Sequence, residues 1–161
     1  MNSEEVIKKI IEKKISITTM ESCTGGFLIS CITDVEGAST ITEGGFVTYS
    51  NEQKERVGVP KETINTYGVY SSETAEKMAE VCREKMNCHI GIGVTGTLSN
   101  VDPNNSDSVQ GEVYFCIKYD DKTVSKKITV PIESRHKQKE FIRDNVFNEM
   151  GKLIYSLNEN F

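Results

Sequence analysis

Hydroxyl and glycine residues gather in the segment 21–26, Glu-Ser-Cys-Thr-Gly-Gly. The segment follows an alternating strand-like pattern and precedes a short apolar helical pattern, so we expect it to join a strand to a helix. Backbone N–H groups at such a helix start, with the helix dipole, favour an anion or a developing oxyanion. Ser22 and Thr24 would add hydroxyls there. Gly25 and Gly26 would let a ligand approach closely. The structural alternative is a helix cap followed by glycines that permit tight packing.

Polar residues also stand where two further predicted strands end. In an open α/β sheet, ligands bind outside the carboxyl ends of the strands, and parallel strands bring those ends to one edge. Ser39, in a small polar loop, shortly precedes the second of these strands. The residues at or just beyond the two strand ends join Ser22 and Thr24 in the expected site, and they are Tyr49, Asn51, Lys54, Thr95 and Gly96.

These residues include no histidine and no pair of carboxylates, so a histidine-activated nucleophile is poorly supported. A serine–lysine arrangement remains, because a partly buried lysine with a lowered pKa can accept a serine proton. Lys54 is the expected lysine. Each residue also has a structural explanation when taken alone: Ser39 as a loop hydroxyl, Lys54 as a solvated helix charge, and Thr95 as a turn residue.

Metal and cofactor motifs are weak in this chain. Two histidines and five cysteines without a CxxC pair do not predict a zinc site. Most of the cysteines are expected to be small buried hydrophobes, with Cys23 as an exception because a helix start favours a thiolate. Residues 102–107 faintly resemble a calcium loop but lack its central glycine and final glutamate. GxGxxG and P-loop motifs are absent. We therefore expect no metal and no cofactor.

The composition predicts one compact domain spanning residues 1–161, because 37% of the residues are hydrophobic and 27% are charged. A net charge of −5 argues against nucleic acid or an anionic membrane as the main partner. An acidic chain can still hold a local basic pocket for an anionic small molecule. The sequence shows no membrane span and no signal peptide, so a cytoplasmic location is expected.

Hydrophobic periodicity predicts an α/β fold in which helices alternate with the first three of five strands. Alternation predicts parallel pairing, whereas the Asp-Asp-Lys turn at 120–122 predicts an antiparallel pair near the end. We expect a three-layer α/β/α sandwich with a mixed, mostly parallel sheet of about five to six strands. A final helix carries an apolar stripe from Phe141 to Leu157, and such a helix could support a homo-oligomer. The strands are expected at 15–20, 45–49, 90–94, 112–119 and 124–130.

Several runs together resemble the CinA C-terminal domain family, over nearly the whole chain and in the family's order. They are residues 20–26 (Met-Glu-Ser-Cys-Thr-Gly-Gly), 34–39 (Asp-Val-Glu-Gly-Ala-Ser), 45–51 (Gly-Phe-Val-Thr-Tyr-Ser-Asn), 67–71 (Tyr-Gly-Val-Tyr-Ser) and 93–96 (Gly-Val-Thr-Gly). The resemblance implies a metal-independent nicotinamide-nucleotide amidase, which converts nicotinamide mononucleotide to nicotinate mononucleotide and ammonia in pyridine-nucleotide salvage. In many bacteria this domain follows a molybdopterin-binding-like domain, whereas here it is expected to stand alone.

The resemblance also implies roles for single residues. Ser39 matches the expected nucleophile, with Ser22 and Lys54 as its hydroxyl and amine partners. Tyr49 and Thr95 match pocket residues. Arg135, the first residue of a basic run that opens the last helix, matches an arginine that would meet the phosphate; the same run could instead be a solvated face. Which serine attacks stays open: Ser22, at a helix start, is better placed to cap the helix or to donate to an oxyanion.

One segment departs from the family pattern. After Thr-Gly the family usually continues with a glycine-rich loop of the Ala-Gly-Pro-Gly-Gly type, but this chain has a bulkier polar loop at 97–110. A loop of this length is either functional or disordered. The change leaves two alternatives to the amidase: a nucleotide-binding module of the same fold with little or no turnover, or an amidase with a different carboxamide substrate.

Overall fold

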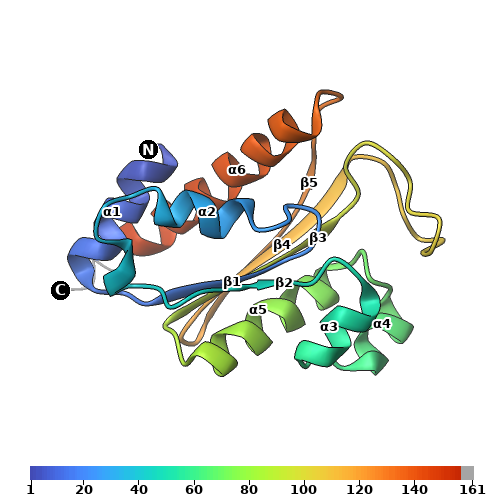
Figure 1. Cartoon of the computed structure of the whole chain (residues 1–161), viewed down its shortest axis with the longest axis horizontal. Helices are drawn as coiled ribbons and strands as arrows, with labels where there is room; N and C mark the ends of the chain where they lie inside the picture. The colour runs from blue at the N-terminus through green and yellow to red at the C-terminus, as the bar shows by residue number, and fades with distance from the viewer. Residues whose placement is uncertain (157–161) are drawn as a thin grey trace.

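The computed structural model describes residues 1–156. A five-stranded sheet with the order β2-β1-β3-β4-β5 forms its centre (Figure 1). The strands are β1 (Ile17–Glu21), β2 (Phe46–Val47), β3 (Ile90–Gly96), β4 (Glu112–Tyr119) and β5 (Lys122–Thr129). The helices are α1 (Ser3–Lys13), α2 (Phe27–Thr33), α3 (Asn51–Val57), α4 (Lys61–Tyr67), α5 (Ser72–Met86) and α6 (Arg135–Ser156), with a short 3₁₀ helix η1 (Ala38–Thr40).

Helices cover both faces of the sheet, which confirms the predicted three-layer α/β/α architecture. Helices α1, α2 and α6 lie on one face, and α3, α4 and α5 lie on the other (Figure 1). The sequence of β3 explains how α5 packs so closely. Gly91 and Gly93 face α5, where a Cβ at Gly93 would collide with the carbonyl oxygen of Ala75. The residues between and beside these glycines point to the opposite face and join the main core.

The sheet is mixed, as expected, but it is not mostly parallel. Strand β1 pairs in parallel with β2 and β3, whereas the β3–β4 and β4–β5 pairs are antiparallel, so the pairings divide two and two. The physical reason is the connections. Helical crossovers join the first three strands, whereas a loop without a helix joins β3 to β4 and a tight turn joins β4 to β5. Strand β2 is also shorter than the predicted 45–49.

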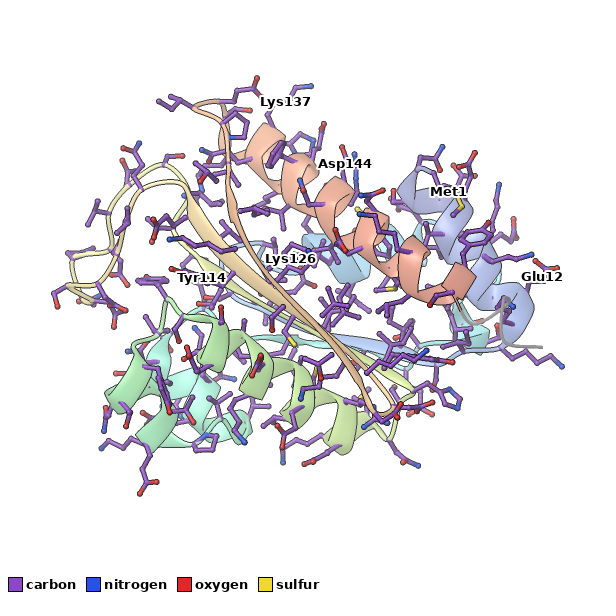
Figure 2. The ribbon with its side chains drawn as sticks, turned by 180° about the vertical axis from the view of Figure 1, so that it is seen from behind. Met1, Glu12, Tyr114, Lys126, Lys137 and Asp144 are labelled. Carbon is purple, nitrogen blue, oxygen red and sulfur yellow. The ribbon has the colours of Figure 1, made fainter. Side chains whose placement is uncertain are left out.

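Side-chain caps fix the starts of two helices. At the start of α1, Asn2 and Glu5 form a reciprocal capping box with N···O distances of 2.9 and 3.0 Å. The Ser71 side chain caps α5. Seen from behind in Figure 2, Met1 lies beside the last turns of α6, where the Tyr155 hydroxyl donates to its sulfur.

The main core lies between the sheet and the layer of α1, α2 and α6, and a smaller cluster lies under α4 and α5. The expected stripe on α6 is largely buried, but Phe141 is 37% exposed. Leu157, the last residue of that stripe, and the end of the predicted domain lie outside the described residues. Within residues 1–156, no helix combines the length and the apolar character needed to cross a membrane.

Candidate active site

A pocket of about 800 Å³ opens at the carboxyl ends of the parallel strands. Its wall comes from the turn after β1, the β2–α3 connection, the segment before α5, the loop after β3, and Arg135 at the start of α6. The loop after β3 projects beyond the sheet at the end where α3 and α4 lie (Figure 1). The pocket therefore lies where an open α/β sheet usually binds its ligands. Six residues predicted for the site line it: Ser22, Tyr49, Asn51, Lys54, Gly96 and Arg135.

Ser22 and Lys54 form a buried pair in this pocket. Lys54 Nζ donates to Ser22 Oγ at 3.1 Å and to the Thr48 carbonyl oxygen at 2.8 Å. The Lys54 side chain is only 1% exposed, and among the described residues no carboxylate forms an ion pair with it. Burial lowers the pKa of Lys54 from 10.5 to about 8, against the opposing pull of the Asp102 and Glu52 carboxylates. A lysine in this state can act as a base near neutral pH.

Local structure holds both members of the pair in place. The Ser22 backbone N–H donates to the Val94 carbonyl at 3.0 Å, which ties the turn after β1 to the neighbouring strand. The Ser50 side chain caps α3 by accepting from the Gln53 N–H, so Lys54 begins the second turn of a fixed helix. A strand end and a capped helix therefore bring the serine hydroxyl and the amine together.

Cys23, the next residue, also lines the pocket but is not a thiolate. Burial raises its pKa to about 12, although the positive charges of Lys54 and Arg135 oppose that rise. The expectation that a helix start would favour the thiolate is therefore wrong, because loss of water outweighs the nearby charges. The hydroxyl that hydrogen-bonds to Lys54 in the pocket is that of Ser22.

The helix start itself does not present its N–H groups to the pocket. The fully buried Glu21 carboxylate accepts from the N–H groups of Leu28 and Ile29 at 2.8 and 3.0 Å. It also accepts from the hydroxyls of Thr24 and Thr19 at 2.7 and 3.0 Å. The chain's own carboxylate thus occupies the anion position that the sequence suggested for a ligand. A charged residue at the end of a buried strand was the signal for this role.

Three predicted ligand-binding residues consequently have structural roles. Thr24 is buried and bonded to Glu21, and neither it nor the two glycines lines the pocket. Gly25 and Gly26 adopt φ values of 60° and 97°, which make the turn into α2. A Cβ at Gly26 would also lie 3.3 Å from Val47 on β2. The glycines agree with the packing part of the structural alternative, but Gly26 stands at the N-cap of α2 and no Ser or Thr side chain caps that helix.

Thr95 and Ser39 are also absent from the pocket wall. Thr95 is completely buried and donates to the Val69 carbonyl at 3.0 Å, so its hydroxyl holds β3 to the segment before α5. Ser39 lies in η1, near the amino end of β1, where Ile17 bonds to Ile41. Ser22 follows the carboxyl end of that strand, roughly 15 Å away at 3.3 Å per residue. Ser39 instead borders a separate shallow hollow formed by residues 33–44, so the structure does not bring it to Lys54.

Cationic and aromatic groups lie on the α6 side of the pocket. The Arg135 guanidinium donates to the Tyr49 hydroxyl at 3.2 Å, and both residues line the pocket. Lys139, one turn further along α6, lies close to the turn after β1, since a Cβ at Gly25 would be 3.6 Å from its Nζ. This side of the pocket can therefore receive an anionic group.

The loop after β3 is ordered by hydrogen bonds centred on Asp102. One carboxylate oxygen accepts from the Tyr70 hydroxyl and from Asn105 Nδ2, both at 2.6 Å, and the other accepts from the Asn104 N–H at 2.8 Å. Asn51 in turn donates to Asn105 at 2.8 Å. Sequence reasoning missed these pocket residues and noted only a faint calcium loop. Among residues 1–156, no group of three or more metal-ligating side chains is present.

Fold and site together define a three-layer α/β/α domain with a buried serine–lysine pair in a pocket at the carboxyl edge of the sheet. A model of the CinA C-terminal domain matches residues 2–154, and the chain belongs to this family. A protein of Thermoanaerobacter pseudethanolicus named as competence-damage inducible is 41% identical over 127 residues, which are 78% of this chain and 30% of that protein. One of Limosilactobacillus fermentum is 34% identical and covers 96% of this chain, which spans 36% of its length.

Solved structures share the fold. A competence or damage-inducible protein of Enterobacter asburiae superposes with a TM-score of 0.86 at 23% identity, covering 96% of this chain and 99% of that one. A competence/damage inducible protein of Agrobacterium tumefaciens superposes with a TM-score of 0.80 at 25% identity, covering 97% and 95% of the two chains. The chain thus matches whole solved chains of the superfamily, but only about a third of the length of these two curated relatives.

Proposed function

We propose that this CinA-family domain hydrolyses the carboxamide of nicotinamide mononucleotide, giving nicotinate mononucleotide and ammonia without a metal ion. The observation that supports it most is the 3.1 Å contact between Lys54 Nζ and Ser22 Oγ in the buried wall of the pocket. A buried amine beside a hydroxyl is one of the few ways to activate serine without histidine. The identity of the substrate is inferred from the family resemblance, and the type of reaction is inferred from the serine–lysine pair in the pocket.

The first step needs Lys54 in its neutral form. With a pKa of about 8, roughly one molecule in ten carries the neutral amine at pH 7. The neutral Nζ accepts the Ser22 hydroxyl proton as Oγ attacks the carboxamide carbon. In the resulting tetrahedral intermediate, the ammonium of Lys54 gives its proton to the departing nitrogen, and ammonia leaves. We assign the nucleophile to Ser22 in place of Ser39, because Ser39 lies near the opposite end of β1.

The second step hydrolyses the ester formed between Ser22 and the nicotinoyl group. Lys54, neutral again, accepts a proton from water as the hydroxyl attacks the ester carbon, and the Ser22 oxygen then takes that proton as it leaves. The amide and one water have then become the acid and ammonia.

The phosphate of the mononucleotide would lie on the α6 side of the pocket. Arg135 faces the pocket and is held by the Tyr49 hydroxyl, and Lys139 adds a second positive charge nearby. An arginine can bind a phosphate through two parallel hydrogen bonds, which also orients the nucleotide. This arrangement keeps Arg135 in the role implied by the family resemblance.

Ammonia release from nicotinamide mononucleotide tests the proposal, with thermal shift measured on the same samples. We expect turnover in the natural chain and a loss of about a thousandfold or more in Ser22→Ala. Ser39→Ala is the matched control and should keep its activity, because the residue is remote from the pocket. Full activity in Ser22→Ala would refute the mechanism. A thermal shift without ammonia would instead support a binding module, and turnover of other carboxamides alone would change the substrate.

A further inference from the structure

Besides Glu52 and Lys54 of α3, charged side chains of opposite sign reach the pocket from two further elements. Arg135 comes from the start of α6, and Asp102 comes from the loop after β3. The proposed mechanism uses Arg135 for the phosphate but gives Asp102 no task. Asp102 is also part of the loop that departs from the family's glycine-rich pattern. A carboxylate in a pocket that is proposed to bind a phosphorylated molecule requires an explanation.

The structure keeps the Asp102 carboxylate charged and fixed. Hydrogen bonds from Tyr70, Asn105 and Asn104 hold its two oxygens at 2.6 to 2.8 Å. Partial burial by itself would raise the pKa of this group, but these hydrogen bonds and the attraction of Lys54 outweigh burial and lower it. The negative charge also acts on the Lys54 ammonium, so its field reaches the reacting pair. Asp102 therefore places a negative charge in the wall of the pocket that also holds Lys54.

The ring that carries the carboxamide exists in two charge states in biology. In oxidised nicotinamide mononucleotide the ring is a pyridinium with a positive charge, whereas in the reduced form it is a neutral dihydropyridine. Both forms carry the same ribose, phosphate and carboxamide. A fixed carboxylate near the ring discriminates between the two forms by charge alone, because it attracts the cationic ring and has no such attraction for the neutral ring.

We propose that Asp102 makes the pocket selective for the positively charged pyridinium ring of the oxidised mononucleotide over its neutral dihydro form. The inference rests on the proposed function, since it assumes that this nucleotide enters the pocket. A unit charge in a half-buried site, with partial screening by water, gives a preference of roughly tenfold. Asp102 acts here as a specificity residue and takes no part in bond making.

Binding measurements separate this role from a purely structural one. Calorimetry on the Ser22→Ala background compares the oxidised and reduced mononucleotides without turnover. We expect the oxidised form to bind about tenfold more tightly, and Asp102→Asn to remove most of that ratio. Asp102→Glu, which keeps the charge, should retain the preference. The matched control is Asp107→Asn: Asp107 is an exposed carboxylate of the same loop that contacts the Tyr70 N–H at 3.4 Å and does not line the pocket.

The ratio of the two dissociation constants decides the outcome. If Asp102→Asn weakens both ligands equally, the residue only braces the loop and the inference is wrong. Equal binding of both ligands before Asp102 is changed also refutes it, while leaving the proposed function intact. If neither ligand binds, the proposed function and this inference are both refuted. Asp102→Ser supplies a second neutral side chain if Asp102→Asn does not fold.

Discussion

Replacing Lys54 by methionine separates the catalytic value of this lysine from its effect on stability. Methionine is unbranched and apolar, so it fills nearly the same buried space without a charge. We expect Lys54→Met to lose amidase activity by about a thousandfold or more, as other removals of a catalytic base do. We also expect the variant to be at least as stable as the natural chain at pH 7. Loss of activity with no loss of stability is unusual for a fully buried residue.

The magnitude follows from the pKa of Lys54. It falls from 10.5 in the unfolded chain to about 8 in the folded one. That difference corresponds to about 3 kcal/mol of destabilisation at pH 7. Methionine removes this cost but leaves the Thr48 carbonyl without the hydrogen bond from Nζ, which costs about 1–3 kcal/mol. The net change at pH 7 is therefore about 0–2 kcal/mol in favour of the variant.

The dependence on pH has a defined sign. Below pH 8, Lys54 is protonated in both states, and the full cost of burying its charge is present. Between pH 8 and 10.5, the unfolded chain binds a proton that the folded chain does not, so the stability of the natural chain rises with pH. Above 10.5 the cost is absent. The advantage of Lys54→Met should therefore shrink by about 3 kcal/mol between pH 7 and 10.5.

Urea unfolding of both proteins at several pH values measures this difference, and groups that titrate alike in both proteins cancel. Lys126→Met is the matched control, because Lys126 is an exposed lysine on the edge strand β5 (Figure 2). It should show no such trend. In parallel, kcat/KM of the natural chain should rise towards pH 8 and then level off as Lys54 becomes neutral. A difference between the natural chain and Lys54→Met that stays constant with pH would refute a lowered pKa and, with it, the proposed base.

Four further substitutions test the assignments around the pocket. In a steady-state assay, Arg135→Gln should raise KM for nicotinamide mononucleotide by about ten- to a hundredfold without changing KM for the riboside. Tyr49→Phe removes only the hydroxyl that supports Arg135, so it should raise the same KM by less. Glu21→Gln should destabilise the fold by about 2–4 kcal/mol in urea unfolding. The NH2 group of glutamine would face the hydroxyl and N–H groups that now donate to the Glu21 carboxylate. Unchanged stability would contradict the capping role of Glu21. Thr95→Val should lower the free energy of unfolding by about 1 kcal/mol and leave KM unchanged. A raised KM would indicate that Thr95 belongs to the binding site.

Much of the fold was readable from local sequence patterns. The helical crossovers between the first three strands and the tight turn at 120–122 follow from short-range features, and each agrees with the structure. Parallel strands then required that Ser22 and Lys54 meet at one edge of the sheet. The balance of strand directions was not readable, because it depends on how the loop after β3 returns rather than on any local pattern.

The sequence by itself determined the family, the layered fold and the edge of the sheet where a site would form. Tertiary structure decided which residues occupy it. Ser39 is close to the site in sequence but is separated from Lys54 by the length of β1. The Glu21 carboxylate accepts from the N–H groups at the start of α2, which the sequence suggested for a ligand, and Asp102 is held in the pocket wall by a hydrogen bond from the distant Tyr70. Burial and long-range hydrogen bonds set these roles, and neither is encoded in the spacing of residues along the chain.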